Sequence, residues 1–360
     1  MPSSLPQALQ EILQKALEKL PARRFAKAPD MAQALQQTMA TPELQPWLEH
    51  RLPWRDLPII AMPKLLASDH PVLLAAPVTN LITVQNNLVA ASGQQIQIWR
   101  QSGPPPVSLE LPEPIHAVSA HAQGCLVQTQ QRLYWLPVED WQPQPWLSLE
   151  GNFTAAVDPS GQNLAVAVPG CLCFYKVFEK PDRAGRLATL QRTLPFSEKR
   201  LPRVFFLNRN HVLLVWHQPE QKHSQTLLKV CTRRGTWIGS LQLPLSLNQL
   251  TLIPTCHTLF GVDWGSEPIA WRVGLLPPQV ARIPLAGIPL CSMASISRQV
   301  LIDAQGHITL LEQEQHQVMQ FKGLGTPTAI TTWGLNQLAI ATDDGKQSYL
   351  YFQSAAGVLS

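Results

Sequence analysis

The chain has 360 residues, of which 45% are hydrophobic, so it is long enough to bury a large core. Its net charge of +4 implies by itself no nucleic-acid or membrane partner, and its six cysteines are too few for a disulfide scaffold of this length. No window approaches the roughly 18–20 apolar residues of a spanning helix, and no secretory signal is visible, so we expect a soluble, cytoplasmic protein.

The first 40 residues are predicted to be helical. Apolar residues at helical spacing predict one helix over 5–20, which Pro21 ends. A second helix is predicted from near Pro29 to about Met39, because proline and then Asp30 suit a helix start. Residues 41–77, rich in proline and tryptophan, are interpreted as a connector that contributes a closing strand. We therefore expect a helical segment at 1–40, a connector at 41–77 and one further domain at 78–360.

From about residue 78 the apolar period changes from near 3.6 to 2, and similar segments recur. Each consists of an apolar strand, a polar hairpin turn and a second strand with an aromatic residue or leucine near its end. Seven copies are found, at 88–100, 125–138, 164–177, 212–230, 259–273, 300–313 and 338–353. The repeat length is therefore about 40 residues, which is typical of one four-stranded sheet.

A sheet of about 40 residues exposes both faces and cannot bury them alone. When such sheets are set radially around an axis, each covers its neighbour and only short edges stay open. The sequence therefore predicts an all-β fold, a seven-bladed β-propeller behind a short N-terminal α-helical segment.

Three stretches resemble WD-repeat propellers. They are IQIWR at 96–100, similar to a third strand; AAVDPSGQNLAVA at 155–167, similar to a first hairpin; and TDDG at 342–345, similar to the turn between second and third strands. The Gly-His pair of that family is absent, and its Trp-Asp pair is replaced by Trp99-Arg100 and Trp271-Arg272. The resemblance implies a propeller whose blades depend more on apolar packing than on the family's buried polar network.

The segment LQKALEKLPARRFAKAPDMAQAL at 13–35 resembles the last subdomain of bacterial eukaryotic-like Ser/Thr protein kinases. Those domains close with a helix, a turn of the form L-x-x-x-P-x-x-R-F and an alanine-rich helix. The matching positions of this chain are Leu17, Pro21, Arg24, Phe25, Met31, Ala34 and Leu35. An unrelated helical hairpin with solvated arginines is the alternative.

The rest of a kinase is missing from the sequence. It has no glycine-rich loop, Val-Ala-Ile-Lys strand, His-Arg-Asp loop, Asp-Phe-Gly or Ala-Pro-Glu, and phosphoryl transfer needs the groups that those motifs supply. We therefore expect no kinase activity. The resemblance implies a kinase remnant in front of a propeller, either a relic or a brace that was kept.

Charge is unevenly distributed along the chain. Residues 176–234 hold 13 basic and four acidic residues, a net charge of +9, whereas the remainder holds 15 basic and 20 acidic residues, a net charge of −5. Such a field attracts acidic protein surfaces. The candidate partner-binding residues are Lys180, Arg183, Arg186, Arg192, Lys199, Arg200 and Arg203. A solvated loop without a partner is the alternative. Nucleic acid is less favoured, because the segment has few aromatic residues for base stacking.

No residue pattern indicates a catalytic, metal or cofactor site. Cys171 and Cys173 lack a second ligand pair at zinc spacing, and we interpret them as core cysteines. The recurrent aromatic residues Trp99, Trp135, Tyr175, Trp271 and Tyr351 are interpreted as packing between blades.

The sequence therefore predicts a non-catalytic protein-interaction scaffold without a cofactor. One alternative is an accessory or sensor part of a Ser/Thr kinase whose catalytic lobes are encoded separately. A second alternative is a nucleic-acid-associated protein that uses the basic region 176–234.

Overall fold

The structure is a computed structural model. It describes residues 7–18, 22, 24–39, 55–56, 59–61, 71–101, 105–178, 187–220, 223–243, 247–253, 258–264, 268–275, 278–285, 287–294, 299–311, 316–333 and 337–354. The chain divides into two compact units: Met1–Arg55 with Gln279–Ala281, and Asp56–Pro278 with Arg282–Ser360.

The N-terminal unit contains the expected helical segment, as α1 (Gln7–Ala16) and α2 (Ala28–Met39). α1 ends earlier than the predicted position 20. The last helical hydrogen bond runs from Leu17 N to Leu13 O, and the carbonyl of Glu18 instead accepts a bond from Nε of Arg24 at 2.6 Å. At the start of α2, the carboxylate of Asp30 accepts a bond from the main-chain N of Lys27 at 3.1 Å, which is the return bond of a capping box.

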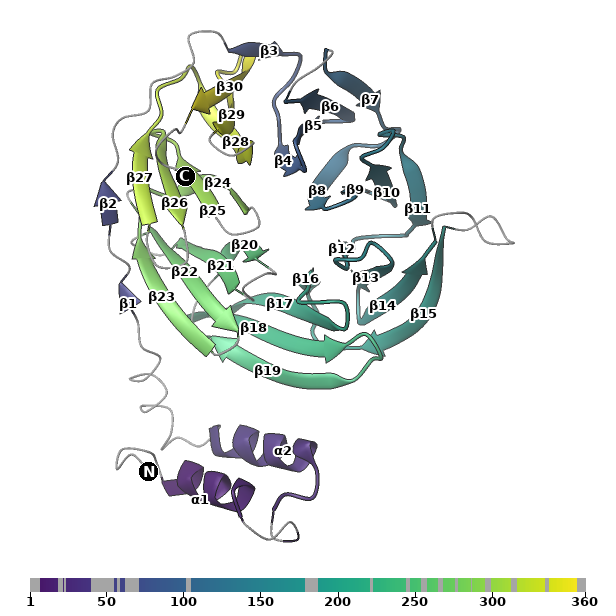
Figure 1. Cartoon of the computed structure of the whole chain (residues 1–360), viewed down its shortest axis with the longest axis vertical. Helices are drawn as coiled ribbons and strands as arrows, with labels where there is room; N and C mark the ends of the chain where they lie inside the picture. Colours follow the sequence, from purple (N-terminus) through teal and green to yellow (C-terminus); the bar gives the residue numbers. More distant parts are fainter. Residues whose placement is uncertain are drawn as a thin grey trace. The chain divides into compact units, whose positions relative to one another are not determined.

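The second unit is a ring of seven antiparallel sheets, the blades (Figure 1). The predicted all-β, seven-bladed propeller is therefore confirmed. Blade 1 holds β4 (Asn80–Val84), β5 (Asn87–Ser92), β6 (Gln95–Arg100) and β7 (Val107–Glu110). Blade 2 holds β8 (Ile115–His121), β9 (Gly124–Thr129), β10 (Arg132–Pro137) and β11 (Gln144–Ser148). Blade 3 holds β12 (Thr154–Val157), β13 (Asn163–Val168), β14 (Cys171–Val177) and β15 (Ala188–Pro195). Blade 4 holds β16 (Arg203–Phe206), β17 (His211–Glu220), β18 (His223–Thr232) and β19 (Trp237–Leu243).

The last three sheets also include strands from the connector. Blade 5 holds β20 (Asn248–Ile253), β21 (Thr258–Trp264), β22 (Pro268–Leu275) and β23 (Pro278–Pro284), next to which lies β1 (Arg55–Asp56). Blade 6 holds β24 (Pro289–Ala294), β25 (Gln299–Asp303), β26 (His307–Leu311) and β27 (His316–Gln320), to which β2 (Ile59–Ala61) adds in parallel. Blade 7 holds β28 (Thr326–Trp333), β29 (Gln337–Asp343) and β30 (Ser348–Ser354), and its outer strand is β3 (Val72–Leu74).

Each repeat recognised in the sequence is the hairpin of the second and third strands of one blade. In blade 1, for example, the copy at 88–100 covers β5 and β6, in which Leu88 pairs with Trp99. Strand alternation then distributes the side chains between the two neighbouring blades. Leu88 and Ala90 pack with blade 7, whereas Val89 and Ala91 pack with blade 2. Both faces of the sheet are thereby buried, as the period-2 pattern requires.

The aromatic residues near the ends of third strands also lie between blades. Trp99 packs in the cluster between blades 7 and 1, and Tyr351 in the cluster between blades 6 and 7. Trp135 stacks on Trp146 with 4.9 Å between ring centroids, in the cluster between blades 2 and 3 against which Tyr175 packs. The inter-blade interpretation is confirmed for these four predicted residues.

The ring closes between blades 7 and 1. β3 pairs antiparallel with β30, with Val72 opposite Leu350, so a strand from before the first blade completes the last one. Across the junction, Nε1 of Trp333 donates to the carbonyl of Asn86 at 3.2 Å. The hydroxyl of Thr83 donates to the carbonyl of Thr332.

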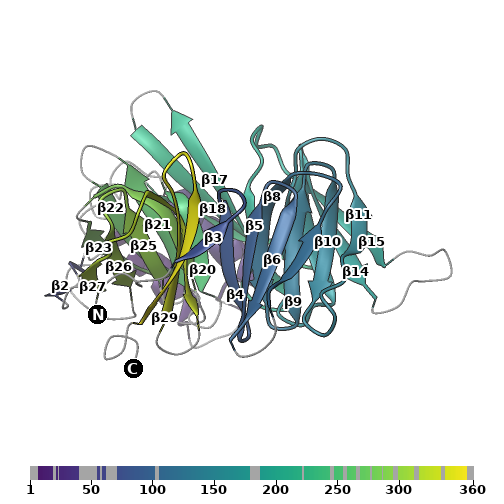
Figure 2. The same ribbon diagram turned by 90° about the horizontal axis from the view of Figure 1, so that it is seen from above.

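Two ends of the ring follow from the antiparallel order. Face A, as we call it, carries the turns from first to second and from third to fourth strands. Face B carries the turns from second to third strands and the links between blades. The long β17–β18 hairpin projects beyond its neighbours on one side of the ring (Figure 2). Among the described residues, no helix is both long enough and apolar enough to cross a membrane.

Candidate protein-interaction surface

The structure separates the candidate residues predicted from the sequence. Lys180, Arg183 and Arg186 lie outside the described residues. Lys199, Arg200 and Arg203 lie together on face B, in the link from β15 to β16 and at the start of β16. Arg192 lies on β15 and reaches toward face A, as described below. The four described residues therefore do not form a single cluster.

A second group of basic residues gathers on face A of blades 3 and 4. Arg209 lies in the turn from β16 to β17, and Arg233 and Arg234 lie in the turn from β18 to β19. Arg192 of β15 and Lys176 of β14 add to them from blade 3. We call this group the arginine surface: Lys176, Arg192, Arg209, Arg233 and Arg234. All five residues belong to the basic segment 176–234 that the sequence identified. The feature that brings Arg209, Arg233 and Arg234 together is their position in turns at one end of blade 4.

The two turns of blade 4 are tied together by the main chain. The N–H of Arg233 donates to the carbonyl of Asn210 at 2.7 Å. The side-chain oxygen of Asn208 accepts bonds from Asn210 N at 2.9 Å and His211 N at 3.0 Å, which shapes the first turn. In the second turn Gly235 has a φ of +79°, a conformation that suits glycine. The backbones that carry Arg209 and Arg233 are therefore held side by side.

Arg233 also crosses to blade 3. Its Nη1 donates to the side-chain oxygen of Asn163. The amide nitrogen of Asn163 donates in turn to Asp158 at 2.8 Å, and Asp158 is fully buried. Asp158 accepts further bonds from Ser160 Oγ at 2.7 Å and from the main-chain N of Gln162 and of Asn163, each at 3.0 Å. The guanidinium is therefore positioned by a rigid turn.

Arg192 is positioned in a similar way. Its Nη1 donates to the carbonyl of Arg234, and its stem packs where a side chain on Gly235 would lie. The ammonium of Lys176 donates to the side-chain oxygen of Gln162 at 3.1 Å. Three of the five cations thus bind neutral oxygens and not carboxylates.

The described acidic side chains in this region do not neutralise the arginine surface. The described part of 176–234 has nine basic and two acidic residues, a net charge of +7. Of the acidic residues described in blades 3 and 4 and the link between them, Asp158 is buried and saturated with donors. Glu198 pairs with Lys229, and Glu220 ends β17 on face B. Among the residues that the structure describes, face A of these blades therefore carries positive charge without a compensating exposed carboxylate.

Among the three predicted basic residues of face B, Arg203 has a structural side-chain partner, and Arg200 has one through its main chain. Nη1 of Arg203 donates to the carbonyl of Leu250 in blade 5 at 3.2 Å. The carbonyl of Arg200 accepts a bond from Nε1 of the buried Trp216 at 2.9 Å. Desolvation lowers the pKa of Arg203 from its ordinary value, but a guanidinium stays charged at neutral pH.

The paired cysteines lie on one face of β14. The sulfur atoms of Cys171 and Cys173 are 3.8 Å apart, and burial raises the pKa of Cys173 to about 12. Within the described ranges, no three His, Cys, Asp or Glu side chains group as metal ligands.

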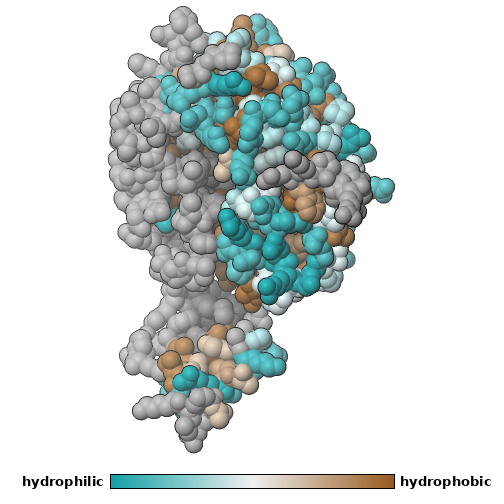
Figure 3. Space-filling view, turned by 45° about the vertical axis from the view of Figure 1, so that its right-hand side comes forward, coloured by the Kyte–Doolittle hydropathy of each residue, from teal (hydrophilic) through white to brown (hydrophobic). Residues whose placement is uncertain are grey.

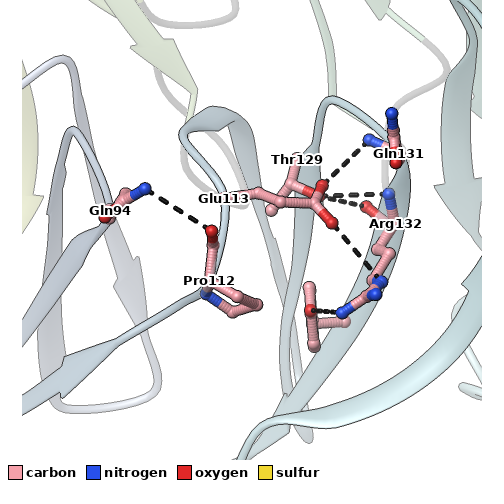
Figure 4. Close-up of polar contacts among 7 residues, drawn as sticks. Gln94, Pro112, Glu113, Thr129, Gln131 and Arg132 are labelled. Atoms are coloured by element: carbon pink, nitrogen blue, oxygen red, sulfur yellow. Dashed lines mark hydrogen bonds and ion pairs between the residues drawn. The ribbon is translucent and has the colours of Figure 1, made fainter.

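A polar cluster on face B joins blades 1 and 2 (Figure 4). The carboxylate of Glu113 accepts bonds from the hydroxyl of Thr129 at 2.6 Å and the main-chain N of Gln131 at 3.0 Å. Nε of Arg132 lies 3.4 Å from the same carboxylate. The bond from Thr129 is the main cause that lowers the pKa of Glu113. The cluster fastens the link between the blades, so we assign it a structural role.

Comparison with known proteins supports the fold. The chain is similar to the Pan2 WD40 domain of Neurospora crassa, with a TM-score of 0.58, 10% identity, and coverage of 82% of this chain and 99% of that one. The chain described here therefore has a WD40-like propeller fold. A chain from the crystal structure of BBS1N in complex with ARL6DN gives a TM-score of 0.55, 12% identity, and coverage of 83% and 100%. No family model and no curated protein matches the sequence.

Proposed function

We propose that the chain is a non-catalytic scaffold that holds a partner protein, and that the arginine surface docks an acidic region of that partner. The observation that carries the proposal is the concentration of five cations at one end of blades 3 and 4, with the described acidic residues there buried or paired elsewhere. Such a potential speeds encounter with an acidic surface and selects against basic ones.

Preorganisation supports docking over simple solvation. Arg233 and Arg192 are already held by Asn163 and by the carbonyl of Arg234, so they lose little side-chain freedom when a partner binds. Each guanidinium has five N–H donors and uses few of them here. The remaining donors suit carboxylates or phosphorylated side chains of a partner.

The proposal retains the sequence-based candidates. Lys180, Arg183 and Arg186 belong to the connection between β14 and β15, and they remain part of the proposed site on sequence alone. Lys199, Arg200 and Arg203 form a separate basic group, which serves as the internal comparison.

The test uses partners that co-purify with the full chain from its native cells. We expect Arg209→Ala, Arg233→Ala and Arg234→Ala together to weaken partner binding at least about tenfold, and affinity to fall as salt rises. The matched control carries Lys199→Ala and Arg200→Ala, which remove exposed charge from face B. Equal binding by the triple variant would refute the arginine surface, and loss only in the control would move the site to face B.

An accessory role beside a Ser/Thr kinase is the second candidate. It is supported by the resemblance of 13–35 to the end of a kinase domain and by two helices with Arg24 and Phe25 between them. Arg24 now bonds to the carbonyl of Glu18, a main-chain acceptor. A neighbouring reading frame encoding the missing kinase motifs would favour this role. Phosphate release from ATP by the purified chain would contradict the non-catalytic proposal.

Nucleic-acid binding is the remaining candidate, because the arginine surface also suits phosphodiesters. A salt titration with mixed DNA and RNA tests it directly. A steep loss of affinity with salt, removed by the triple arginine variant, would favour nucleic acid over protein.

A further inference from the structure

The outer strand of a blade carries main-chain donors and acceptors that stay unpaired unless another strand adds to it, and natural sheets normally protect such edges. β7 is four residues long and ends in Glu110, and β11 contains Pro145. β15 carries Arg192 and ends in Pro195. In blade 7, β3 is only three residues long. Short length, charge and proline thus protect four edges.

Blades 5 and 6 are protected as well. β23 has prolines at both ends and Arg282 between them. β27 is covered by β2, which pairs in parallel with Ile59 opposite His316 and Ala61 opposite Val318. An outer edge of this ring therefore accepts an added extended segment, even one of three residues.

The outer strand of blade 4 lacks these protections. β19 (WIGSLQL) has seven residues, none of them charged and none proline. A bulge at its start leaves Ile238 without an opposite residue in β18. The outer strands β11 and β15 also have a bulge each in their pairing with the third strand, near the middle of the strand. After the bulge, residues 239–243 pair regularly with β18. Among the strands that the structure describes, none pairs with the free side of β19.

Exposed apolar side chains mark the same strand. Trp237 is 36% exposed and Ile238 is 49% exposed, at consecutive positions. The surface on the side of blades 1 to 3, by contrast, is mainly hydrophilic (Figure 3). The ammonium of Lys229, which is paired with Glu198, lies 5.5 Å from the ring of Trp237 and borders this apolar region without adding net charge to it.

We propose that β19 is a docking edge, to which an extended, acidic segment of a partner protein adds as a fifth strand of blade 4. The inference rests on the proposed function, because the arginine surface supplies the charge that selects the segment. The turn with Arg233 and Arg234 leads directly into Trp237, the first residue of β19. Main-chain bonds along 239–243 provide affinity, and the adjoining guanidinium groups bind acidic side chains at one end.

Charge favours this occupant over a second copy of the chain. Pairing β19 with β19 of another copy would bring together two regions that each carry a net charge of +7 over the described part of 176–234. Like charges brought together oppose association. An acidic segment is attracted by the same positive charge. We therefore propose a different protein as the partner.

The experiment uses the full chain and an eight-residue peptide of alternating glutamate and valine, capped at both ends, as the probe. One control peptide has prolines in place of the valines, which keeps the charge and removes strand pairing. Another has threonine in place of glutamate, which keeps strand propensity and removes the charge. The protein variants are Ile238→Glu on the edge and Ile288→Glu as the matched control, since Ile288 is also exposed, at 52%.

We expect the glutamate-valine peptide to bind and to slow amide hydrogen exchange across 239–243. The proline and threonine peptides should each bind at least about tenfold more weakly, because one lacks main-chain bonds and the other lacks charge. Ile238→Glu should weaken binding similarly, and Ile288→Glu should not.

Three results would overturn the inference. The first is that the proline peptide binds as tightly as the glutamate-valine peptide and neither slows amide hydrogen exchange in β19. The peptides would then dock by charge alone, and the proposed function would still hold. The second is absence of binding by the glutamate-valine peptide. The third is a dimer of the free chain that Ile238→Glu dissociates, which assigns β19 to a second copy. The proposed function is tested separately, by measuring whether the triple arginine variant loses binding to the native partner.

Discussion

His121 of blade 2 and Asp158 of blade 3 meet on face A, where Nε2 of the imidazole lies 3.0 Å from the main-chain carbonyl oxygen of Asp158. The carboxylate of the same aspartate faces inward, into its own turn. On the other side, Arg233 of blade 4 reaches that turn through Asn163. One buried aspartate therefore organises a turn that joins three consecutive blades.

Removal of this carboxylate should destabilise the ring. Asp158→Ala leaves four donors without their acceptor, so we expect the free energy of unfolding to fall by about 3 kcal/mol. Ser160→Ala removes only one of these donors and should cost about 1 kcal/mol. Urea unfolding followed by tryptophan fluorescence measures both. Equal, small losses would show that the turn does not depend on Asp158.

The junction that closes the ring should be equally sensitive. Trp333 is 8% exposed, packs 4.7 Å from Phe352 between ring centroids and donates to Asn86. Trp333→Ala should lower the free energy of unfolding by about 3–5 kcal/mol. Trp237→Phe on the exposed β19 should change it by less than about 0.5 kcal/mol. Thermal unfolding compares the two; a mild effect of Trp333→Ala would mean that the blades hold together without this junction.

Stability should depend on pH through Glu113. The pKa of this carboxyl is lowered in the folded state, chiefly by the bond from Thr129, so the ionised form stabilises the fold above the unfolded pKa of about 4.3. That contribution is lost as pH falls through the lower, folded pKa. We expect Glu113→Gln to cost about 1–2 kcal/mol at pH 7 and progressively less below about pH 4. Unfolding measured from pH 7 to pH 3 tests this, and parallel curves would contradict it.

Cysteine reactivity should follow burial. Burial raises the pKa of Cys125 and of Cys231 to about 12, so at pH 8 only about one thiol in ten thousand is ionised. Cys171 is half-buried. Brief alkylation of the native protein at pH 8, located by mass spectrometry, should modify Cys171 well before the other two. Denatured protein should react at all three, and equal native rates would show that the blades open readily.

The propeller was predictable because its information is local. The segment at 164–177 alternates apolar residues across a two-residue turn, and the structure pairs Val168 with Cys171 there. Because each blade repeats the pattern once, the number of hairpins predicted from the sequence equals the number of blades. The resemblance of 155–167 to a first hairpin agrees with the pairing of β12 and β13, although it did not reveal which neighbouring blades bind the turn between them.

The candidate surface was less predictable because it depends on which ends of strands meet. Charge counting identified 176–234, but it grouped Lys199 and Arg200 with Arg192, and strand direction separates them. Arg209 and Arg233 are far apart in sequence, and a main-chain bond from Arg233 to Asn210 joins their turns. The edge of β19 was missed because its sequence is ordinary, and its distinction is the lack of protection found on the other edges.

The placement of β3 has a consequence for synthesis on the ribosome. Val72 leaves the exit tunnel before any complete blade, but its partner Leu350 lies in β30 and is translated only after the first six blades. The nascent ring therefore waits with one blade unfinished and an apolar flank uncovered until β30 has been translated. Chains that a nonsense codon ends before β30 should then be captured by chaperones or degraded.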